Sequence, residues 1–257
     1  MADVVTQVVN ADEPQVLDGA PWIRIVPLRT PTLPPATHTN CYIIGEATAA
    51  TVIDPASPYP GEQERLEHFV RKHNITVRDI VLTHHHVDHV SGATRLAEQT
   101  GAPIAAHPVT AEKLRGQVAV TRTLDEGDRV GGLVARFTPG HAPGHLCFVD
   151  AEGRAIVAGD MVASVGTIII EPSDGGDMAL YLASLARLRA EVDAGATRLL
   201  PAHGPPIVDG GARIDFYVAH RLEREGRVLA ARSLLAHLLK LERDGKVAHA
   251  SDRWSLI

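Results

Sequence analysis

Four side chains that can bind a metal ion lie within the short segment VLTHHHVDHVSG, and they are His84, His86, Asp88 and His89. The apolar run at residues 80–83, just before them, predicts a buried strand. Side chains two residues apart on an extended chain point the same way, so the first two histidines can hold one ion together while His85 points away. The aspartate and the last histidine follow after a turn and can face a second ion. Imidazole and carboxylate groups suit zinc and similar divalent metals.

Three more side chains of the same kinds follow far along the chain, namely His141 in FTPGHAPGH, Asp160 in IVAGD and His203 in LLPAHGP. Each comes at the end of an apolar run that predicts a strand. Strand ends that adjoin loops are where catalytic groups usually lie in layered α/β folds. A histidine-rich turn can also be a solvated loop or a chance cluster. The fixed Asp-His pair and the three strand-end residues favour a metal site instead.

The elements that must position these residues alternate between strands and helices and then become mostly β. Residues 41–44 and 50–53 predict a hairpin, and the segment GEQERLEHFVRKHN predicts a helix before the strand at residues 80–83. Strand and turn signals fill residues 121–150, and DMALYLASLARLRAEVD predicts a helix before a last core strand. This order predicts two β-rich halves with helices outside. A length of 257 residues favours one main domain, residues 1–212, with an appendage, residues 213–257.

The appendage predicts a long helical stretch followed by a small hairpin in KVAHASDRWSLI. It carries nine Lys and Arg against six Asp and Glu, whereas the whole chain has a formal net charge of -6. The appendage is therefore the one candidate for an anion-facing surface. Its apolar stripe is expected to pack on the main domain or, alternatively, to form a homodimer interface. The stripe consists of Phe216, Val218, Leu222, Leu229, Leu235, Leu238 and Leu239.

Composition argues against several classes of protein. No apolar run approaches the ~20 residues that cross a bilayer, and the segment MADVVTQVVN lacks the features of a secretory signal, so neither is expected. Only two cysteines occur, Cys41 and Cys147, without a CxxC pair, which favours a reducing, cytoplasmic compartment. The net charge of -6 argues against a dedicated nucleic-acid binder.

Taken together, these motifs resemble the metallo-β-lactamase superfamily, whose pattern is a strand-end Asp, HxHxDH, a TPGH-type turn, a bridging Asp and a last His. Here the strand-end Asp is Asp54 in VIDP, and every other position of the pattern is filled as well. The resemblance implies an α/β fold, the four-layer αββα sandwich, with a small helical or winged-helix-like appendage. It also implies that His84, His86 and His141 hold a first metal. Asp88, His89 and His203 would hold a second metal, with Asp160 bridging the two.

Two other residues are implied to support the ligands. Asp54 is expected behind them, where a carboxylate can orient the ligand loop, although an Asp-Pro turn that merely ends a strand is an equal alternative. His145 resembles the second histidine of the TPGHxxGH turn and is expected in a structural or supporting role.

The implied cofactors are two divalent metal ions, with zinc favoured and iron or manganese as alternatives. Two metals ~3.5 to 4 Å apart can share a water and lower its pKa to ~7, which makes a bridging hydroxide available as the nucleophile of a hydrolase. Asp88, or a metal-bound water, would return a proton to the leaving group. Asp88 is therefore expected to act in catalysis as well as in metal binding.

Within the superfamily, GDMVASVGTIIIEPSDGGDMALYLASL, HGPP and FYVAHRLERE look like the branch that contains beta-lactamase-like protein 2. Members of that branch end in a winged-helix-like domain. The tail here keeps a first helix, a last helix (SLLAHLLKLERDG) and a wing-like hairpin around Trp254. The tail has too few residues for the usual complete set of helices between these two, so the resemblance implies a shortened winged helix.

Three functions follow from these observations. The favoured one is hydrolysis of a small ester, thioester or lactone, because the core is acidic and Met161 and residues 168–170 are apolar neighbours of the site. The alternative is hydrolysis of single-stranded RNA or another phosphodiester, which the basic tail and the resemblance to a branch that contains an endoribonuclease support. A weak β-lactamase or a non-enzymatic metal-binding module ranks below both. The expected partner is thus a small-molecule substrate, with RNA not favoured and no membrane.

Overall fold

A computed structural model describes residues 14–150, 152, 154–250 and 253–256. The chain divides into two compact units, Met1–Ile214 and Asp215–Ile257. All the candidate site residues belong to the first unit. None of the helices in the described ranges is both long and apolar enough to cross a membrane.

The first unit begins with a seven-stranded sheet whose strands lie side by side in sequence order. The strands are β1 (Gln15–Leu17), β2 (Ala20–Arg29), β3 (His38–Glu46), β4 (Ala49–Ile53), β5 (Val77–Val81), β6 (Ile104–Ala106) and β7 (Arg122–Thr123). Strands β1 to β4 pair antiparallel, and β4 to β7 pair parallel. Parallel neighbours need crossover connections. These contain α1 (Pro60–Lys72), α2 (Val87–Val90), α3 (Ala93–Thr100) and α4 (Pro108–Lys113).

A second sheet has five strands in the order β12-β11-β10-β9-β8. Its strands are β8 (Arg129–Val130), β9 (Leu133–Phe137), β10 (Leu146–Asp150), β11 (Ala155–Gly159) and β12 (Arg198–Pro201). Strands β11 and β12 run parallel, and the connection between them contains the 3-10 helix η1 (Pro172–Asp174) and helix α5 (Met178–Asp193).

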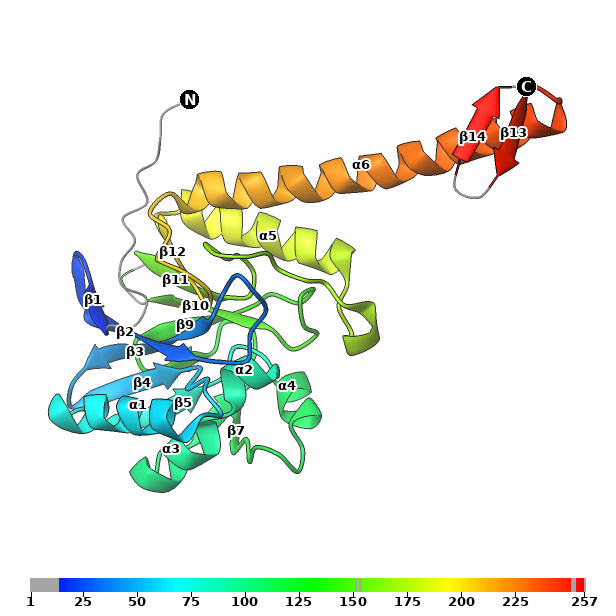
Figure 1. The fold of residues 1–257 in the computed structure, drawn as a ribbon. Coiled ribbons are helices and arrows are strands. Elements are labelled where there is room, and N and C mark those ends of the chain that lie inside the picture. The colour runs from blue at the N-terminus through cyan, green and yellow to red at the C-terminus, as the bar shows by residue number, and fades with distance from the viewer. Residues whose placement is uncertain (1–13, 151, 153, 251–252, 257) are drawn as a thin grey trace. The chain divides into compact units, whose positions relative to one another are not determined.

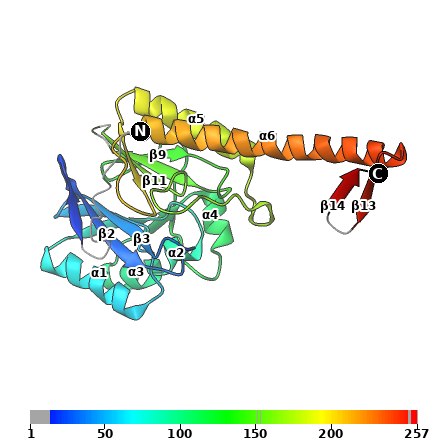
Figure 2. The same ribbon diagram turned by 45° about the horizontal axis from the view of Figure 1, so that its top comes forward.

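Two apolar layers hold the first unit together, and alternate side chains of the first sheet supply both. Val26 packs with Leu66 of α1 and Leu96 of α3 on one face of the sheet. Its neighbour Ile25 packs on the other face, in a cluster that includes Phe148 of the second sheet. Helix α5 lies along the outer side of the second sheet (Figures 1 and 2). The order helix, sheet, sheet, helix confirms the expected αββα sandwich.

The strand expected at residues 80–83 ends earlier than its apolar letters suggest, because β5 stops at Val81. The backbone N–H of Thr83 donates to Asp54 Oδ1 at 2.8 Å instead of to a neighbouring strand. Asp54 directly follows β4 and has a φ of 49°. A hydrogen bond to a side chain thus takes the place of a backbone hydrogen bond between strands at the point where the histidine segment begins.

The second unit contains most of α6 (Gly210–Arg243) and an antiparallel hairpin of β13 (Val247–Ala250) and β14 (Arg253–Leu256). The long helical stretch expected in the tail is confirmed, because α6 is continuous and includes both the first and the last helix that the resemblance implied. The sequence offers no proline after Pro206, and Gly226 alone costs a helix only about 1 kcal/mol. Of the apolar stripe, Phe216, Leu222 and Leu229 are each at least 50% exposed.

Candidate metal centre

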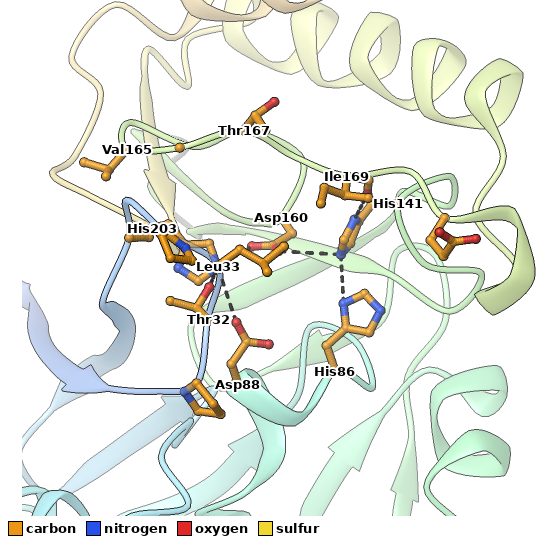
Figure 3. Close-up of a pocket in the computed structure, with 15 residues that line it drawn as sticks. Thr32, Leu33, His86, Asp88, His141, Asp160, Val165, Thr167, Ile169 and His203 are labelled. Atoms are coloured by element: carbon orange, nitrogen blue, oxygen red, sulfur yellow. Dashed lines mark hydrogen bonds and ion pairs between the residues drawn. The ribbon is translucent and has the colours of Figure 1, made fainter.

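The loops at one end of the two sheets bring the seven predicted ligand side chains together. The first two histidines follow β5, and the next Asp-His pair lies in the short helix α2. The other three residues come soon after β9, β11 and β12, at the strand ends that the sequence indicated. Three overlapping groups, each with ligand atoms within 4.8 Å of one another, contain all seven residues. Figure 3 shows His86, Asp88, His141, Asp160 and His203 around a common space.

Three ring nitrogens form the first group. His84 Nε2 lies 2.9 Å from His86 Nδ1 and 3.2 Å from His141 Nε2, and the last two atoms are 3.0 Å apart. Nitrogens that bind one tetrahedral zinc at about 2.0–2.1 Å lie about 3.3 Å from each other. The spacing of these atoms therefore fits three ligands of a single small cation.

A second group consists of Asp88, His89 and His203. Asp88 Oδ2 lies 3.7 Å from His203 Nε2. Asp160 lies between the two groups. Its Oδ2 is 3.5 Å from His141 Nε2, and its Oδ1 is 3.4 Å from His203 Nε2 and 3.6 Å from His89 Nε2. One carboxylate thus presents an oxygen to each group, which is the arrangement that a bridging ligand requires.

The second ring nitrogen of each clustered histidine is held by a neighbour. Carbonyl oxygens accept from two of them, with Ile169 O 2.8 Å from His141 Nδ1 and His38 O 3.0 Å from His203 Nδ1. A ring nitrogen that donates leaves its partner nitrogen without a hydrogen, which is the form that binds a metal. The carbonyls therefore fix both rings with Nε2 ready to act as a ligand.

Asp54 holds two more of the histidines, His89 directly and His84 through Thr83. Its Oδ2 accepts from His89 Nδ1 at 2.8 Å and from Thr83 Oγ1 at 2.7 Å. A hydroxyl has a single hydrogen, so Thr83 Oγ1, which donates to Asp54, must accept from His84 Nδ1 at 3.0 Å. The structure thus places Asp54 behind the ligands, in contact with the loop that carries them. The Asp-Pro turn is present as well, but it does not account for these contacts.

His145 lies under Asp160. Its Nε2 accepts from the backbone N–H of Asp160 at 3.1 Å, and its Nδ1 lies 2.9 Å from Thr138 Oγ1. Gly159, with a φ of 47°, permits this approach, because a Cβ there would lie 2.6 Å from His145 Nε2. The imidazole supports the backbone that positions the central carboxylate.

Burial and neighbouring charges divide the titrating groups into two kinds. Burial lowers the pKa of His84 well below its usual value, and burial lowers that of His141 to about 4 despite the nearby Asp160. Burial opposes protonation of His89 too, but Asp160, Asp88 and Asp54 outweigh it and raise the pKa of His89 to about 10. His84 and His141 are therefore neutral at pH 7, whereas the carboxylates around His89 favour a positive charge on its ring.

Two buried atoms in the cluster have no hydrogen-bond partner among the described residues. They are His89 Nε2 and Asp160 Oδ1, which lie 3.6 Å apart. A buried polar atom without a partner costs about 1–3 kcal/mol, so such atoms usually indicate a missing ligand or ion. Their chemistry, one imidazole nitrogen and one carboxylate oxygen, fits a divalent cation.

A pocket of about 470 Å³ opens above the cluster, and the stick view shows its walls (Figure 3). Leu33 and Pro34 come from the loop after β2, and Ile169 and Glu171 come from the segment before η1. No Lys or Arg occurs among the described residues that line it. Met161, which the sequence suggested as an apolar neighbour of the substrate, is fully buried and is not part of the lining.

Sequence reasoning missed the groups that hold the rings. The oxygen atoms of His38 and Ile169 that accept from histidines are backbone atoms, and no side-chain pattern marks them. Asp174 was also missed, although its Oδ2 lies 2.8 Å from both His85 Nε2 and His86 Nε2. It lies 88 residues from His86, and only the acidic stretch EPSDGGD could have drawn attention to it.

Comparison with known protein families shows to which family the chain belongs. A sequence model of the "Metallo-beta-lactamase superfamily" matches residues 34–203, which include all seven clustered side chains. The chain belongs to this superfamily. The "Beta-lactamase associated winged helix domain" matches residues 221–254, which confirms the expected likeness of the tail. Membership and the His/Asp cluster together make the protein a metal-dependent hydrolase of the metallo-β-lactamase superfamily.

Several curated proteins are similar along most of the chain. "Lactamase-like protein vrtG" of Penicillium aethiopicum is 33% identical over 89% of this chain and 70% of its own length. "Beta-lactamase-like protein 2 homolog" of Caenorhabditis elegans is 29% identical, covering 75% of this chain and 64% of its own. "Atrochrysone carboxyl ACP thioesterase AgnL7" of Paecilomyces divaricatus is 32% identical, covering 75% and 59%. The chain thus spans 59 to 70% of these relatives.

Solved structures share the fold. A beta-lactamase domain protein from Burkholderia ambifaria has a TM-score of 0.70 with 21% identity, and the match covers 98% of each chain. TTHA1623, solved "in a di-iron-bound form", has a TM-score of 0.59 with 29% identity, and the match covers 72% of this chain and 96% of the other. The first shows the likeness of the fold alone, and the second is a relative whose structure holds two irons.

Proposed function

We propose that the protein is a dinuclear metal-dependent hydrolase of small esters, thioesters or lactones. The observation that carries the proposal is the position of Asp160, which presents one oxygen to the three-histidine group and the other to the Asp88–His89–His203 group. Zinc is the favoured metal for such ligands. Iron and manganese are the alternatives, and the di-iron form of the relative TTHA1623 supports iron in particular.

The side chains have separate tasks in this proposal. Two bound cations would supply an activated water at neutral pH and polarise the carbonyl group under attack. His84, His86 and His141 would hold the first cation, while Asp88, His89 and His203 would hold the second. Asp88 is partly exposed at the base of the pocket, so its carboxyl group can also pass a proton to the leaving group.

The pocket walls support a substrate without negative charge. Leu33, Pro34 and Ile169 offer apolar contacts, and Glu171 adds a carboxylate at the same wall. Hydrogen bonds from the hydroxyl and the backbone N–H of Ser173 lower the pKa of Glu171, so it is ionised at neutral pH. Several relatives are named as thioesterases, which agrees with an acyl substrate.

Hydrolysis of single-stranded RNA is the second candidate. The resemblance to the branch of beta-lactamase-like protein 2, to which a relative named as its homolog adds, and the excess of basic residues in the tail favour it. Without a Lys or Arg in the described pocket lining, however, no side chain of permanent positive charge would bind the phosphates that lie outside the metal centre. Binding through phosphates weakens steeply as salt rises. Turnover of ester, thioester, lactone and phosphodiester substrates at 50 and 500 mM salt therefore separates the candidates, with salt-insensitive ester or thioester turnover expected.

Substitution of Glu171 tests the charge preference of the pocket. For Glu171→Gln, we expect kcat/KM for an anionic ester to rise about two- to fivefold at low salt, because the substitution removes one exposed charge that repels the anion. For the matched neutral ester, kcat/KM should stay within about 1.5-fold. Glu98→Gln, an exposed carboxylate on α3 outside the pocket, is the control. An equal response of both esters to Glu171→Gln would contradict the assignment.

Cation binding to the second group should release protons. In the metal-free protein, the raised pKa of His89, about 10, keeps the ring protonated at pH 7.5, and the pKa of His203 is raised as well. His84 and His141, whose pKa values are lowered, have no proton to lose. We expect about one to two protons released per two cations bound, measured by calorimetry in buffers of different ionisation enthalpy. Release of none would contradict this charge distribution.

We also propose a reducing, cytoplasmic environment for the protein. Cys41 and Cys147 are free and buried, which supports this environment.

The exposed Phe216, Leu222 and Leu229 of α6 support a homodimer through the tail. Gel filtration with light scattering of the whole chain, compared with Leu222→Glu, tests the dimer, which the substitution should dissociate.

A further inference from the structure

Asp174 ends the 3-10 helix η1 and lies against two histidines of the VLTHHHVDHVSG segment. Its Oδ2 is 2.8 Å from His86 Nε2 and 2.8 Å from His85 Nε2. Lys113, the last residue of α4, donates from Nζ to Asp174 Oδ1 at 2.8 Å and to the backbone oxygen of Asp174 at 2.9 Å. A carboxylate from one connection is thus fixed by a lysine from another.

His86 differs from the other clustered histidines in the ring atom that it presents. Its Nδ1 lies 2.9 Å from His84 Nε2 and 3.0 Å from His141 Nε2, so Nδ1 is the atom that faces the cation position. A carboxylate only accepts hydrogen bonds, so Nε2 carries the hydrogen and donates it to Asp174. The Asp174 contact therefore selects the tautomer whose Nδ1 lone pair is free.

His86 is also the clustered histidine that most needs such support. Its side chain is 30% exposed, compared with 6% for His141 and 8% for His203. Neighbouring imidazole rings contact it, but the ring is packed less completely than those of the buried histidines. Hydrogen bonding of Nε2 is then the main restraint on its rotation about χ2, and loss of Asp174 would free that rotation.

The segment that carries Asp174 holds a second ligand of the same group, because Ile169 O accepts from His141 Nδ1 at 2.8 Å. Ile169 and Glu171 of this segment also line the pocket. Residues 169–174 thus support two of the three histidines of the first group and form part of the wall that a substrate would contact.

His85, His86 and Asp174 also have the spacing of a separate metal site, with ligand atoms within 4.8 Å of one another. The ammonium group of Lys113 already forms an ion pair with the other carboxylate oxygen of Asp174. A cation bound there would face this positive charge, and His86 would have to bind through both ring nitrogens. The contacts favour an orienting role for Asp174 over a third cation site.

We propose that Asp174, anchored by Lys113, is a positioning residue that holds His86 with Nδ1 toward the first cation and thereby sets the affinity of that site. The inference rests on the proposed function, since it requires that the three histidines bind a cation. Replacing the carboxylate by an amide would weaken the hold on Nε2–H and allow the ring to turn away. Asp174→Glu keeps the acceptor and should restore part of the affinity.

The test measures cation affinity directly, independent of turnover. Whole metal-stripped protein is titrated with Zn²⁺ against a chromophoric chelator, which gives two stepwise dissociation constants. For Asp174→Asn, we expect one constant to rise about 10- to 100-fold and the other to stay within about twofold. Lys113→Met should raise the same constant by a smaller factor. In the Co²⁺-loaded protein, Asp174→Asn should alter the visible absorption of the three-imidazole site.

Asp177→Asn is the matched control. Asp177 caps α5 by accepting from the Leu180 N–H at 2.9 Å, so its loss perturbs the same connection without touching a histidine, and both Zn²⁺ constants should be unchanged. Wild-type constants in Asp174→Asn and Lys113→Met would overturn the positioning role while leaving the proposed function intact. A wild-type protein that binds no Zn²⁺ would overturn both. Unchanged constants in Lys113→Met would overturn the anchoring role if Asp174→Asn proved unable to fold.

Discussion

Asp160→Ala should lose at least about a hundredfold in kcat and retain at most one cation per chain. Replacing a partner of a metal ligand typically costs 10- to 100-fold in affinity or activity, and a carboxylate that contacts both groups should matter at least as much. Its two oxygens lie 3.4 to 3.6 Å from ligand nitrogens of His141, His203 and His89. Removing it also takes away one of the three carboxylates that balance positive charge at His89.

Elemental analysis and turnover of Asp160→Ala are to be compared with Asp18→Ala, which removes an exposed carboxylate outside the site. The control should match the wild type in both measurements. Asp160→Asn, which keeps the size and removes the charge, should behave like the alanine variant in metal content. Two bound cations with near-normal turnover in Asp160→Ala would show that this carboxylate does not join the two groups.

Gly140→Ala should destabilise the protein by about 3–5 kcal/mol, because a strained backbone and a steric collision add at this position. Gly140 precedes His141 and has a φ of 136°. An added Cβ would lie 2.2 Å from the backbone nitrogen of Tyr181 and 2.3 Å from its Cα. Tyr181 is fully buried and donates from its hydroxyl to Met161 O at 2.7 Å. The start of α5 would have to move, and with it the turn that presents His141.

Gly116→Ala separates the cost of the strained backbone from the cost of the steric collision. Gly116 also has a positive φ, 80° compared with 136° at Gly140, but nothing lies within 4 Å of the added Cβ. The backbone cost alone should be about 1–2 kcal/mol. Both variants can be measured by urea denaturation of the metal-free protein, so that cation binding does not add to stability. Equal losses of free energy in the two variants would mean that the close approach of α5 to Gly140 is absent.

The metal cluster could be predicted from the sequence because each ligand follows a strand whose apolar letters mark it clearly. Asp160 directly follows β11, and His203 follows β12 by one residue. Strand ends of two packed sheets meet at one edge, so residue types and positions suffice to bring these groups together. The αββα layering could be predicted for a similar reason, since the alternation of buried residues in β2 assigns Ile25 and Val26 to opposite faces.

Other features depend on contacts that leave no trace in local sequence. The end of β5 at Val81 depends on the Asp54 carboxylate, which replaces the strand partner of Thr83. The support of His86 depends on Asp174, from a connection that is distant in the sequence. The resemblance implied a first and a last helix in the tail, whereas the structure joins them in the single helix α6. Propensity alone predicts the continuous helix α6.

Anomalous diffraction from crystals of the purified protein, recorded on both sides of the zinc, iron and manganese absorption edges, tests the central claim most directly. Two peaks are expected about 3.5–4 Å apart. One should lie among His84 Nε2, His86 Nδ1 and His141 Nε2, and the other near Asp88 and His203, with Asp160 in contact with both. A map of fully loaded, active protein with no peak among these side chains, or with a single peak elsewhere, would contradict a dinuclear centre.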